Sequence, residues 1–424
     1  MTIEAKAGRD WSVLRSRRLW IAGFMGFFGG LPLMLTISIL QAWMTREDIS
    51  LTTIGLFALI GLPYATKFLW APLLDRFSPG TAGRRRSWLY ITQVGLVASI
   101  AYLGLQSPAT AIWPVVGAAF LITFFSATQD IAIDAYRRES LADSEQGLGA
   151  AFYTYGYRIA MLVAGAGGLL IAGRYGYPAA YMVMAAIMSL GLLVTFFVPE
   201  PDEVNVRPKS LYESFVGPFK EFFARGGRFH VEALLLLVFI IAYKFGDNLG
   251  THLSTAFYFG NGFSEEEVAW VRSVLGTGAL FLGIFLGGVF VLKLGTFWSL
   301  FIIGILQAVS TACFAILTVV GDSLVWLAVV IAFEELAAGM GTTALIAFMA
   351  ALTNTRFTAT QFALLSALAN APRAFLVAPA GFLATIMGWP AFFIACGLVA
   401  LPGLALLVYL RGWISRGAAF AHAR

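Results

Sequence analysis

Residues 19–44 read LWIAGFMGFFGGLPLMLTISILQAWM and contain no charged side chain. An α-helix crosses the hydrocarbon core of a bilayer in about 20 residues, so this stretch is long enough to span one. Eleven further apolar stretches of comparable length follow along the chain. They lie near residues 51–75, 88–106, 110–136, 149–172, 177–198, 231–258, 265–292, 296–319, 323–353, 358–386 and 389–411. We therefore predict an all-α integral membrane protein of about twelve transmembrane helices.

The overall composition supports this prediction. Hydrophobic residues make up 59% and charged residues 12% of the 424 residues, whereas an average soluble domain has about half and a quarter. A soluble fold of this size cannot bury so much apolar surface. The 44 glycines also suit helices that pack closely against one another in lipid. The composition thus excludes a soluble protein.

The sequence indicates neither a metal site nor a disulfide. Cys313 and Cys396 lie in different apolar segments, and His230, His252 and His422 lack the spacing of metal ligands. The net charge of +5 does not indicate nucleic acid, because the basic residues cluster beside the apolar segments. We expect a monomer in a lipid bilayer, with no metal, no cofactor and no nucleic-acid partner.

The distribution of lysine and arginine predicts the orientation of the chain. The first apolar stretch is too long for the core of a signal peptide, so we expect it to be an uncleaved helix. With the N-terminus inside, every lysine and arginine outside the predicted helices, apart from Arg46 and Arg174, falls on the cytoplasmic side. Such a bias is the positive-inside rule. We therefore expect both termini in the cytoplasm.

A polar stretch divides the predicted helices into two sets of six. We expect a six-helix N-terminal half at 1–198, a cytoplasmic linker at 199–230 and a six-helix C-terminal half at 231–424. Two parallel halves with a site between them near the middle of the membrane are the architecture of the major facilitator transporters.

The two halves also repeat a sequence pattern. Arg158 is followed by LVA, a glycine and then GYPAAY at 176–181. Arg373 is followed by LVA, a glycine and then GWPAFF at 388–393. Because the matching segments lie in predicted helices five and eleven, they indicate a duplicated six-helix unit.

Three charged side chains of the N-terminal half lie at a similar depth in the membrane. A rise of 1.5 Å per residue places Lys67 roughly 12 Å, Asp130 roughly 10 Å and Arg158 roughly 13 Å from the inner ends of their helices. Charges at such depth are costly and are candidates for function. We expect a Lys–Asp–Arg layer that couples transport to protons or binds an anionic cargo. The alternative is an ion-pair cluster that only holds helices together.

The C-terminal half carries a comparable set of charges. Lys244 and Asp247 lie three residues apart in predicted helix 7, and Glu334 and Glu335 lie near the middle of predicted helix 10. Arg373 lies deep in predicted helix 11. Adjacent carboxylates on a helix point in different directions, so at most one of the two glutamates is expected to face the cavity. A salt bridge between helices is again the alternative to a role in proton coupling or cargo binding.

A second group of charges lies at the inner ends of the helices. Asp75 and Arg76 end the segment KFLWAPLLDRF, which is followed by GRRRSW, and this order resembles the gating loop of major facilitator transporters. An acid at that place can bind basic and helix-terminal groups of the partner half and lock one conformation. Asp134 and Arg138, one turn apart on a helix, are expected to pair and to belong to the same gate.

Tyrosines near these charges are candidates for stacking on sugar rings. We select Tyr64 and Tyr157 for this role. Aromatic packing within the bundle is the alternative.

Several motifs together resemble the AmpG muropeptide permeases. Besides KFLWAPLLDRF and GRRRSW, they are GFFGGLPLMLTISILQAWMT (26–45), SATQDIAIDAYRRE (126–139), GYRIAML (156–162), YKFGDNL (243–249), FEELAAGMGT (333–342) and ATQFALLSALANAPR (359–373). The motifs run from the first to the eleventh predicted helix. Gln129, inside the second of the listed motifs, joins the cargo or coupling candidates. Glu335 departs from the resemblance, which predicts an asparagine there.

The resemblance implies a proton-driven permease of a bacterial inner membrane. Its cargo would be N-acetylglucosaminyl-1,6-anhydro-N-acetylmuramyl peptides, imported for recycling of the cell wall. One alternative is a major facilitator transporter of another large anionic solute, such as acetyl-coenzyme A. Another is an integral-membrane enzyme that acts on a lipid-linked sugar. The duplicated halves favour a transporter over an enzyme.

Overall fold

The computed structural model describes residues 16–201, 208, 210–224, 231–371 and 379–421. Within these residues the regular elements are all helices. Arg373, one of the predicted site residues, lies outside the described residues, so its position is not considered further.

The first half of the chain contains predicted helices 1–6. Helix 1 consists of α1 (Arg17–Met34), a π-helical turn (Leu35–Ile39) and α2 (Leu40–Arg46). Helix 2 is divided into α3 (Leu51–Leu56), a 3-10 segment (Phe57–Gly61), α4 (Leu62–Thr66), a second 3-10 segment (Lys67–Leu69) and α5 (Ala71–Arg76). Then follow α6 (Arg84–Gly104), α7 (Ile112–Ser140), a 3-10 turn (Asp143–Glu145), α8 (Gln146–Leu162), a π-helical turn (Val163–Gly167), α9 (Gly168–Tyr175) and α10 (Tyr177–Phe197).

The second half begins after a helix that lies in the predicted linker, α11 (Leu211–Phe223). Helix 7 consists of α12 (Val231–Tyr243), α13 (Phe245–His252) and α14 (Ser254–Gly260). Helices 8–10 consist of α15 (Glu265–Trp270), a π-helical turn (Val271–Gly276), α16 (Thr277–Val320) and α17 (Leu324–Leu352). Helices 11 and 12 contain a 3-10 turn (Thr355–Phe357), α18 (Thr358–Ala371), α19 (Ala380–Met387) and α20 (Trp389–Ala421).

Nine helices of the described chain are long and apolar enough to cross a bilayer. One of them, Glu266–Val320, contains two predicted spans, which meet where the backbone of Gly295 leaves the helical conformation. Predicted helices 2 and 11 do not count among the nine, because their described pieces are short. Within the described residues each of the twelve predicted segments contains helix, and the predicted fold class is confirmed.

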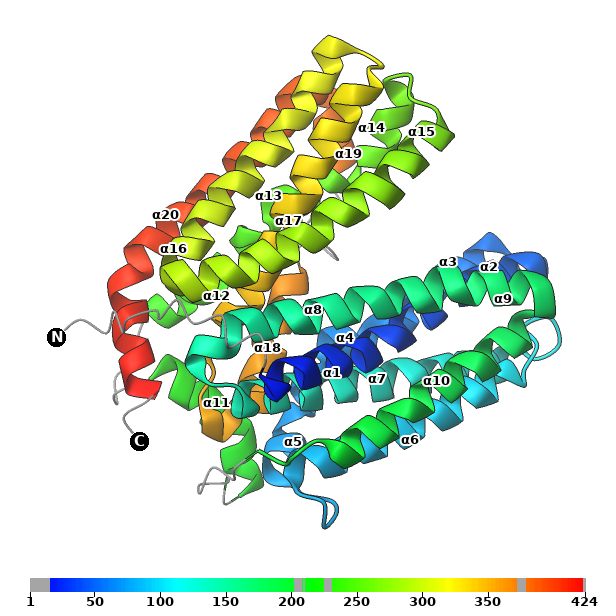
Figure 1. Cartoon of the computed structure of the whole chain (residues 1–424), viewed down its shortest axis with the longest axis vertical. Coiled ribbons are helices and arrows are strands. Elements are labelled where there is room, and N and C mark those ends of the chain that lie inside the picture. Colours follow the sequence, from blue (N-terminus) through cyan, green and yellow to red (C-terminus); the bar gives the residue numbers. More distant parts are fainter. Residues whose placement is uncertain (1–15, 202–207, 209, 225–230, 372–378, 422–424) are drawn as a thin grey trace.

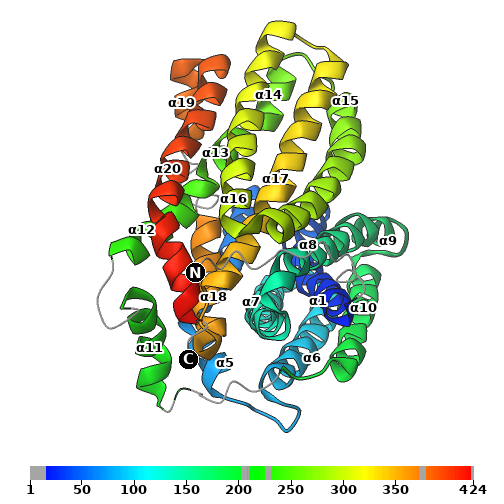
Figure 2. The same ribbon diagram turned by 60° about the vertical axis from the view of Figure 1, so that its left-hand side comes forward.

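The helices form two bundles (Figure 1). Helices α1–α10 form one bundle and α12–α20 the other, and the two approach each other around α5, α11 and the start of α18. The bundles diverge toward α9 on one side and toward α14 and α15 on the other. Rotation by 60° shows the same arrangement, with α5, α11 and α18 together at one end (Figure 2).

Glycines allow α1 and α8 to pack closely. A Cβ atom on Gly156 would lie 1.9 Å from the carbonyl oxygen of Gly23, and one on Gly26 would lie 2.1 Å from that of Tyr153. The second bundle repeats this device between α16 and α17, where a Cβ on Gly283 would lie 2.1 Å from the carbonyl oxygen of Leu336. Small residues at such contacts are typical of helix pairs in membranes.

Gly156→Ala is expected to destabilise the protein because α1 and α8 must separate to admit the methyl group. Overpacking of this kind costs about 1–3 kcal/mol. The matched control is Gly173→Ala, in α9, where a Cβ atom would meet nothing within 4 Å. Thermal unfolding of the purified protein in detergent should show a lower midpoint for Gly156→Ala. The midpoint of the control variant should equal that of the unsubstituted protein. Equal midpoints for the two variants would contradict the close packing.

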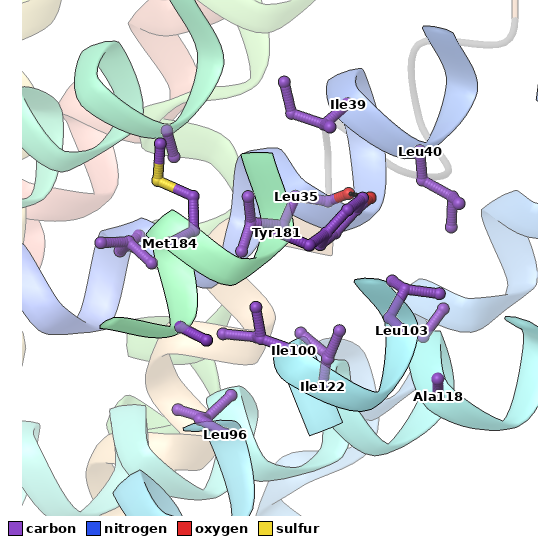
Figure 3. Packing of buried hydrophobic residues seen from close by; sticks show 14 of the residues in the cluster. Leu35, Ile39, Leu40, Leu96, Ile100, Leu103, Ala118, Ile122, Tyr181 and Met184 are labelled. Carbon is purple, nitrogen blue, oxygen red and sulfur yellow. Dashed lines mark hydrogen bonds between the residues drawn. The ribbon is translucent and has the colours of Figure 1, made fainter. Parts of the chain in front are cut away.

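The core of the first bundle includes the π-helical turn of helix 1 (Figure 3). Leu35 packs near Ile100, Ile122 and Tyr181 in one buried cluster. A π-helical turn disturbs the regular ladder of backbone hydrogen bonds. The hydroxyl of Tyr181 donates to the carbonyl oxygen of Leu35 at 2.8 Å, so a buried polar group is satisfied at this irregular place.

The sequence repeat forms the same turn in both bundles. Gly176 has φ 88° and ψ 160°, and Gly388 has φ 74° and ψ 159°. Each glycine ends one helix and starts the next, and residues with a side chain rarely adopt this conformation. The GYPAAY and GWPAFF segments therefore correspond in structure as well as in sequence.

Candidate functional site

The two bundles are joined at one end by a buried carboxylate. Asp75, at the end of α5, is fully buried. Its Oδ1 accepts a hydrogen bond from the backbone amide of Ala359 at 3.0 Å. Its Oδ2 accepts from the backbone amide of Thr360 at 2.9 Å and from the Thr360 hydroxyl at 2.7 Å. A residue of the first bundle thus caps the N-terminus of α18 in the second, where the helix dipole favours negative charge.

Arginines on α6 hold this carboxylate in place. The guanidinium of Arg85 donates to Asp75 Oδ1 at 2.9 Å and to Glu139 Oε2 at 2.9 Å. Arg84 donates to the backbone carbonyl of Asp75 at 2.9 Å. The carboxylates of Glu139 and Asp75 are both nearly inaccessible to solvent. We call the end of the molecule that holds Asp75, Arg85, Glu139 and the start of α18 the charged end.

Glu200 fixes the start of α6 at the charged end. Its two carboxylate oxygens accept hydrogen bonds from the backbone amides of Arg85, at 2.7 Å, and Arg86, at 3.0 Å. These amides belong to the first turn of α6, where no intrahelical acceptor is available. The arginine cluster is therefore anchored both through its backbone and through its side chains.

Two further contacts cross between the bundles. The guanidinium of Arg137 lies over the ring of Tyr153, at 5.4 Å, and over the ring of Phe362 in α18, at 5.3 Å. Tyr155 stacks on Phe281 at 5.3 Å between ring centroids and donates its hydroxyl hydrogen to the carbonyl oxygen of that residue. Such cation–π and aromatic contacts add to the hydrogen bonds of Asp75 in holding the bundles together.

The first bundle also encloses a lysine and two carboxylates. Lys67, Asp130 and Asp134 are all buried. Lys67 lies where helix 2 is interrupted, between α4 and α5. The electrostatic interactions of the Asp130 carboxyl are attraction to Lys67 and repulsion from Asp134. Lys67 also attracts Asp134, which forms a 3.5 Å ion pair with Arg137.

Asp130 is packed tightly but is incompletely bonded. Its Oδ1 is buried and has no hydrogen-bond partner. A Cβ atom on Gly29 of α1 would lie 3.3 Å from this oxygen. The neighbouring Gln129 is also fully buried, and neither its amide oxygen nor its nitrogen is bonded. The hydroxyl of Tyr64 is likewise buried without a partner. Buried polar atoms without partners are costly and mark places of functional interest.

Arg158 has a different environment from the one predicted. It lies on α8 and interacts electrostatically with Tyr157 beside it and with Glu335 on α17 of the second bundle. The attraction that acts on Asp130 comes from Lys67. The attraction within the predicted layer is therefore between Lys67 and Asp130 in one bundle, and Arg158 acts on Glu335 of the other.

The second bundle has its own lysine–carboxylate pair. Lys244 separates α12 from α13, and its ammonium lies 2.9 Å from Asp247 Oδ2. Glu334, buried on α17, interacts with both Asp247 and Lys244. The adjacent Glu335 is half-buried and is attracted mainly by Arg272 and Arg158. Both glutamates interact with Asp247 and Lys244, and Glu335 is attracted in addition by the two arginines.

The predicted pairing of Asp134 with Arg138 is wrong. Arg138 instead forms an ion pair with Asp143 at 2.9 Å, beyond the end of α7. Asp134 pairs with Arg137, three residues away. Both separations place side chains on one helix face, so spacing alone could not choose between them. Arg76 contributes a cation–π contact with Phe77 at 5.3 Å.

Three residues of the charged end were missed by the sequence analysis. Glu139 and Glu200 bind the arginines of α6, and Arg137 bridges the bundles. One signal was present: the cluster Arg84–Arg86 requires acidic partners on the same side of the membrane, and both glutamates lie there in the predicted topology. Among the side chains that the structure describes, His, Cys, Asp and Glu form no group of three suited to a metal ion.

Comparison with known proteins agrees with this geometry. The profile of the Major Facilitator Superfamily matches residues 19–333. The anhydromuropeptide permease of Escherichia coli is 40% identical over 94% of this chain and 81% of its own length. This chain belongs to the AmpG family of the major facilitator superfamily. It is therefore a multi-pass membrane protein of a transporter family.

Other relatives and a solved structure extend the comparison. A putative AmpG transporter of Rickettsia felis is 32% identical over 94% of this chain and 97% of its own length. The crystal structure of a human organic anion transporter superposes with a TM-score of 0.66, covering 92% of this chain and 99% of the other at 19% identity. At that identity the superposition supports the fold alone.

Proposed function

We propose that this protein imports anhydromuropeptides across the inner membrane of a bacterium, driven by the proton gradient. The observation that carries the proposal is the 40% identity, over 94% of the chain, to the anhydromuropeptide permease of Escherichia coli. The cargo would be N-acetylglucosaminyl-1,6-anhydro-N-acetylmuramic acid and its peptides. The protein acts as a monomer and moves its cargo without changing it, so it is not an enzyme.

Transport would proceed by alternating access of two halves. Residues 1–198 and 231–424 are the two bodies, joined by 199–230, with both termini and the charged end in the cytoplasm. In the present structure the contacts of Asp75 with Ala359 and Thr360 join the halves at the charged end. Release of these contacts would let the halves separate there and deliver cargo to the cytoplasm.

Proton coupling is assigned to the two buried lysine–carboxylate groups. Asp130 faces Lys67, and Glu334 faces Asp247 and Lys244. Protonation of a carboxylate removes its attraction to the neighbouring lysine, so one proton changes the forces between helices. Lys67 and Lys244 both lie where a helix is interrupted, and at such places the backbone can adjust at low cost.

Cargo binding is assigned to the groups between the halves. Arg158 and Arg272 supply positive charge for the carboxylates of a muropeptide, with Glu335 between them. Tyr64 and Tyr157 are the candidates for contact with the sugar rings, and Gln129 is a candidate hydrogen-bonding group. Asp134 and Arg138 are assigned to the gate by their place near the charged end; the ion pairs that they form lie within the first half.

Uptake into proteoliposomes tests this function. We expect labelled anhydromuropeptide to accumulate when the outside is acidic, and to stop accumulating when a protonophore collapses the gradient. The label recovered from the vesicles should be intact. Acetyl-coenzyme A serves as the control cargo and should not accumulate. Uptake that ignores the proton gradient would contradict the coupling, and accumulation of acetyl-coenzyme A alone would contradict the cargo.

A further inference from the structure

The linker between the halves contains a helix with two different faces. Ser214, Pro218 and Phe222 of α11 are buried. The opposite face is apolar but exposed. Its residues are 37–76% accessible, and they are Tyr212, Phe215, Val216 and Phe219. An amphipathic helix normally buries its apolar face against the protein, so this exposed face requires a partner.

The position of α11 shows where that partner must be. Pro218, Phe219 and Phe222 line a groove together with Thr360, Gln361, Leu364 and Leu365 of α18. Because α18 begins at Thr358, α11 lies beside the first two turns of that transmembrane helix. Helix α11 therefore lies alongside α18 and not beyond the N-terminal end of α18. Both figures show α11 at the periphery of the bundles, next to α18 (Figures 1 and 2).

Polar contacts hold the inner face of α11 at this level along its length. Near one end, Glu213 forms an ion pair with Arg356. Near the other end, Glu221 accepts hydrogen bonds from the side chains of Asn354, at 3.2 Å, and Gln361. A helix that projected into the cytoplasm would contact the bundle at one end only. Because both ends contact the segment around the start of α18, the helix lies along the surface of the bundle.

The C-terminal end of α11 is continuous with the lipid-facing bundle. Phe222 belongs to the same buried cluster as Leu236 of α12 and Leu410 of α20. On the outside of α12, Val231 and Leu234 are exposed, as expected for residues that contact lipid. The apolar outer face of α11 therefore borders a surface that the bilayer already covers.

We propose that α11 is an interfacial helix, and that its outer face (Tyr212, Phe215, Val216 and Phe219) inserts into the bilayer leaflet at the charged end. A helix with one apolar face lies in the plane of the interface and buries that face among the lipid headgroups and upper acyl chains. The exposed Lys220 flanks this face and lies within reach of lipid phosphates. The inner face of α11 contacts the start of α18, which is also the helix start that Asp75 caps. A helix in contact with lipid would therefore also contact the gate.

Spin labels test this proposal in the full-length protein in nanodiscs. Cys313 and Cys396 are first replaced by alanine, and single cysteines are then introduced by Phe215→Cys and Val216→Cys. Collision with oxygen, which concentrates in lipid, is compared with collision with a water-soluble nickel chelate. We expect both labels to show an oxygen-to-nickel ratio several fold above that of a label in water.

Three control positions give the experiment its scale. Leu234→Cys reports a lipid-facing position, Thr81→Cys an exposed position in the loop at the charged end, and Ser214→Cys the buried face of α11. Ratios at 215 and 216 close to that at 81 would place the face in water and overturn the proposal. Low collision with both reagents, as at 214, would mean that protein covers the face, which also overturns it. The result does not depend on the identity of the cargo.

Discussion

Asp75→Asn is expected to open the charged end and to reduce uptake at least tenfold. The buried carboxylate accepts hydrogen bonds from the amides of Ala359 and Thr360, from the Thr360 hydroxyl and from Arg85. Asparagine has the same shape but no charge, and one of its two terminal groups is a donor that would face other donors. Hydrogen bonds to charged groups contribute about 1.5–3 kcal/mol each. Loss of one such hydrogen bond would lower the ratio of closed to open molecules by about tenfold or more.

The measurement is the distance between spin labels on the two halves at the charged end. Labels at Thr81 and Thr355 should show a longer-distance population in Asp75→Asn than in the otherwise unchanged protein. Thr360→Val removes only the hydroxyl contact with Asp75 and should shift the distribution less.

Asp143→Asn is the matched control for the loss of an aspartate at this end. Its carboxylate pairs with Arg138, but the Asp143 side chain is 53% exposed. Exposed ion pairs contribute little to stability, so distances and uptake should be nearly unchanged. An unaltered distance distribution in Asp75→Asn, with normal uptake, would show that these hydrogen bonds do not hold the gate.

The role of Asp75 illustrates what sequence can predict. An acid followed by arginines at the inner end of a helix indicated a gate, because charge type and membrane side can both be read along the chain. Its partners could not be predicted. Ala359 and Thr360 contribute backbone amides, which every residue except proline has. Only the packing of the two bundles selects these two.

The position of a residue along its helix could be estimated from the sequence, but the direction of its side chain could not. Counting residues placed Asp130 and Arg158 at similar depth. The rise along a helix does not say which face turns toward which neighbour. In the structure the Asp130 carboxylate is attracted by Lys67 of the interrupted helix 2, and Arg158 attracts Glu335 of the other bundle. The helix interruptions at Lys67 and Lys244 could not be predicted, because no pattern in the sequence marks them.

The linker shows a different limit. Residues 199–230 are rich in charge, and their average composition predicted a hydrophilic connection. Averaging concealed α11, whose charged residues Glu213 and Glu221 share one side while Phe215 and Val216 share another. A short amphipathic helix is visible only when the period of its pattern is examined position by position.

Asp130→Asn is expected to abolish the proton-driven accumulation of cargo against its own concentration gradient. The exchange of cargo across the membrane should remain. The substitution keeps the size of the side chain and removes the group that we assign to proton binding. Lys67 would then lose the attraction of one of its two neighbouring carboxylates, while that of Asp134 would remain. If Asp130 carries the coupling proton, the variant should reach the membrane at normal levels and exchange labelled for unlabelled cargo across vesicles. It should not accumulate cargo when the outside is acidic.

A purely structural role predicts a different result. Breaking a buried pair can cost about 3–5 kcal/mol of folding free energy, so Asp130→Asn would then lower both the amount of protein and its thermal unfolding midpoint. The double variant Asp130→Asn, Lys67→Gln removes both charges and should restore stability. Under the coupling role it still fails to accumulate cargo, because the carboxylate that we assign to proton binding in the first half is absent. Full gradient-driven uptake by this double variant would show that Asp130 and Lys67 serve only to hold helices α7 and α4–α5 together.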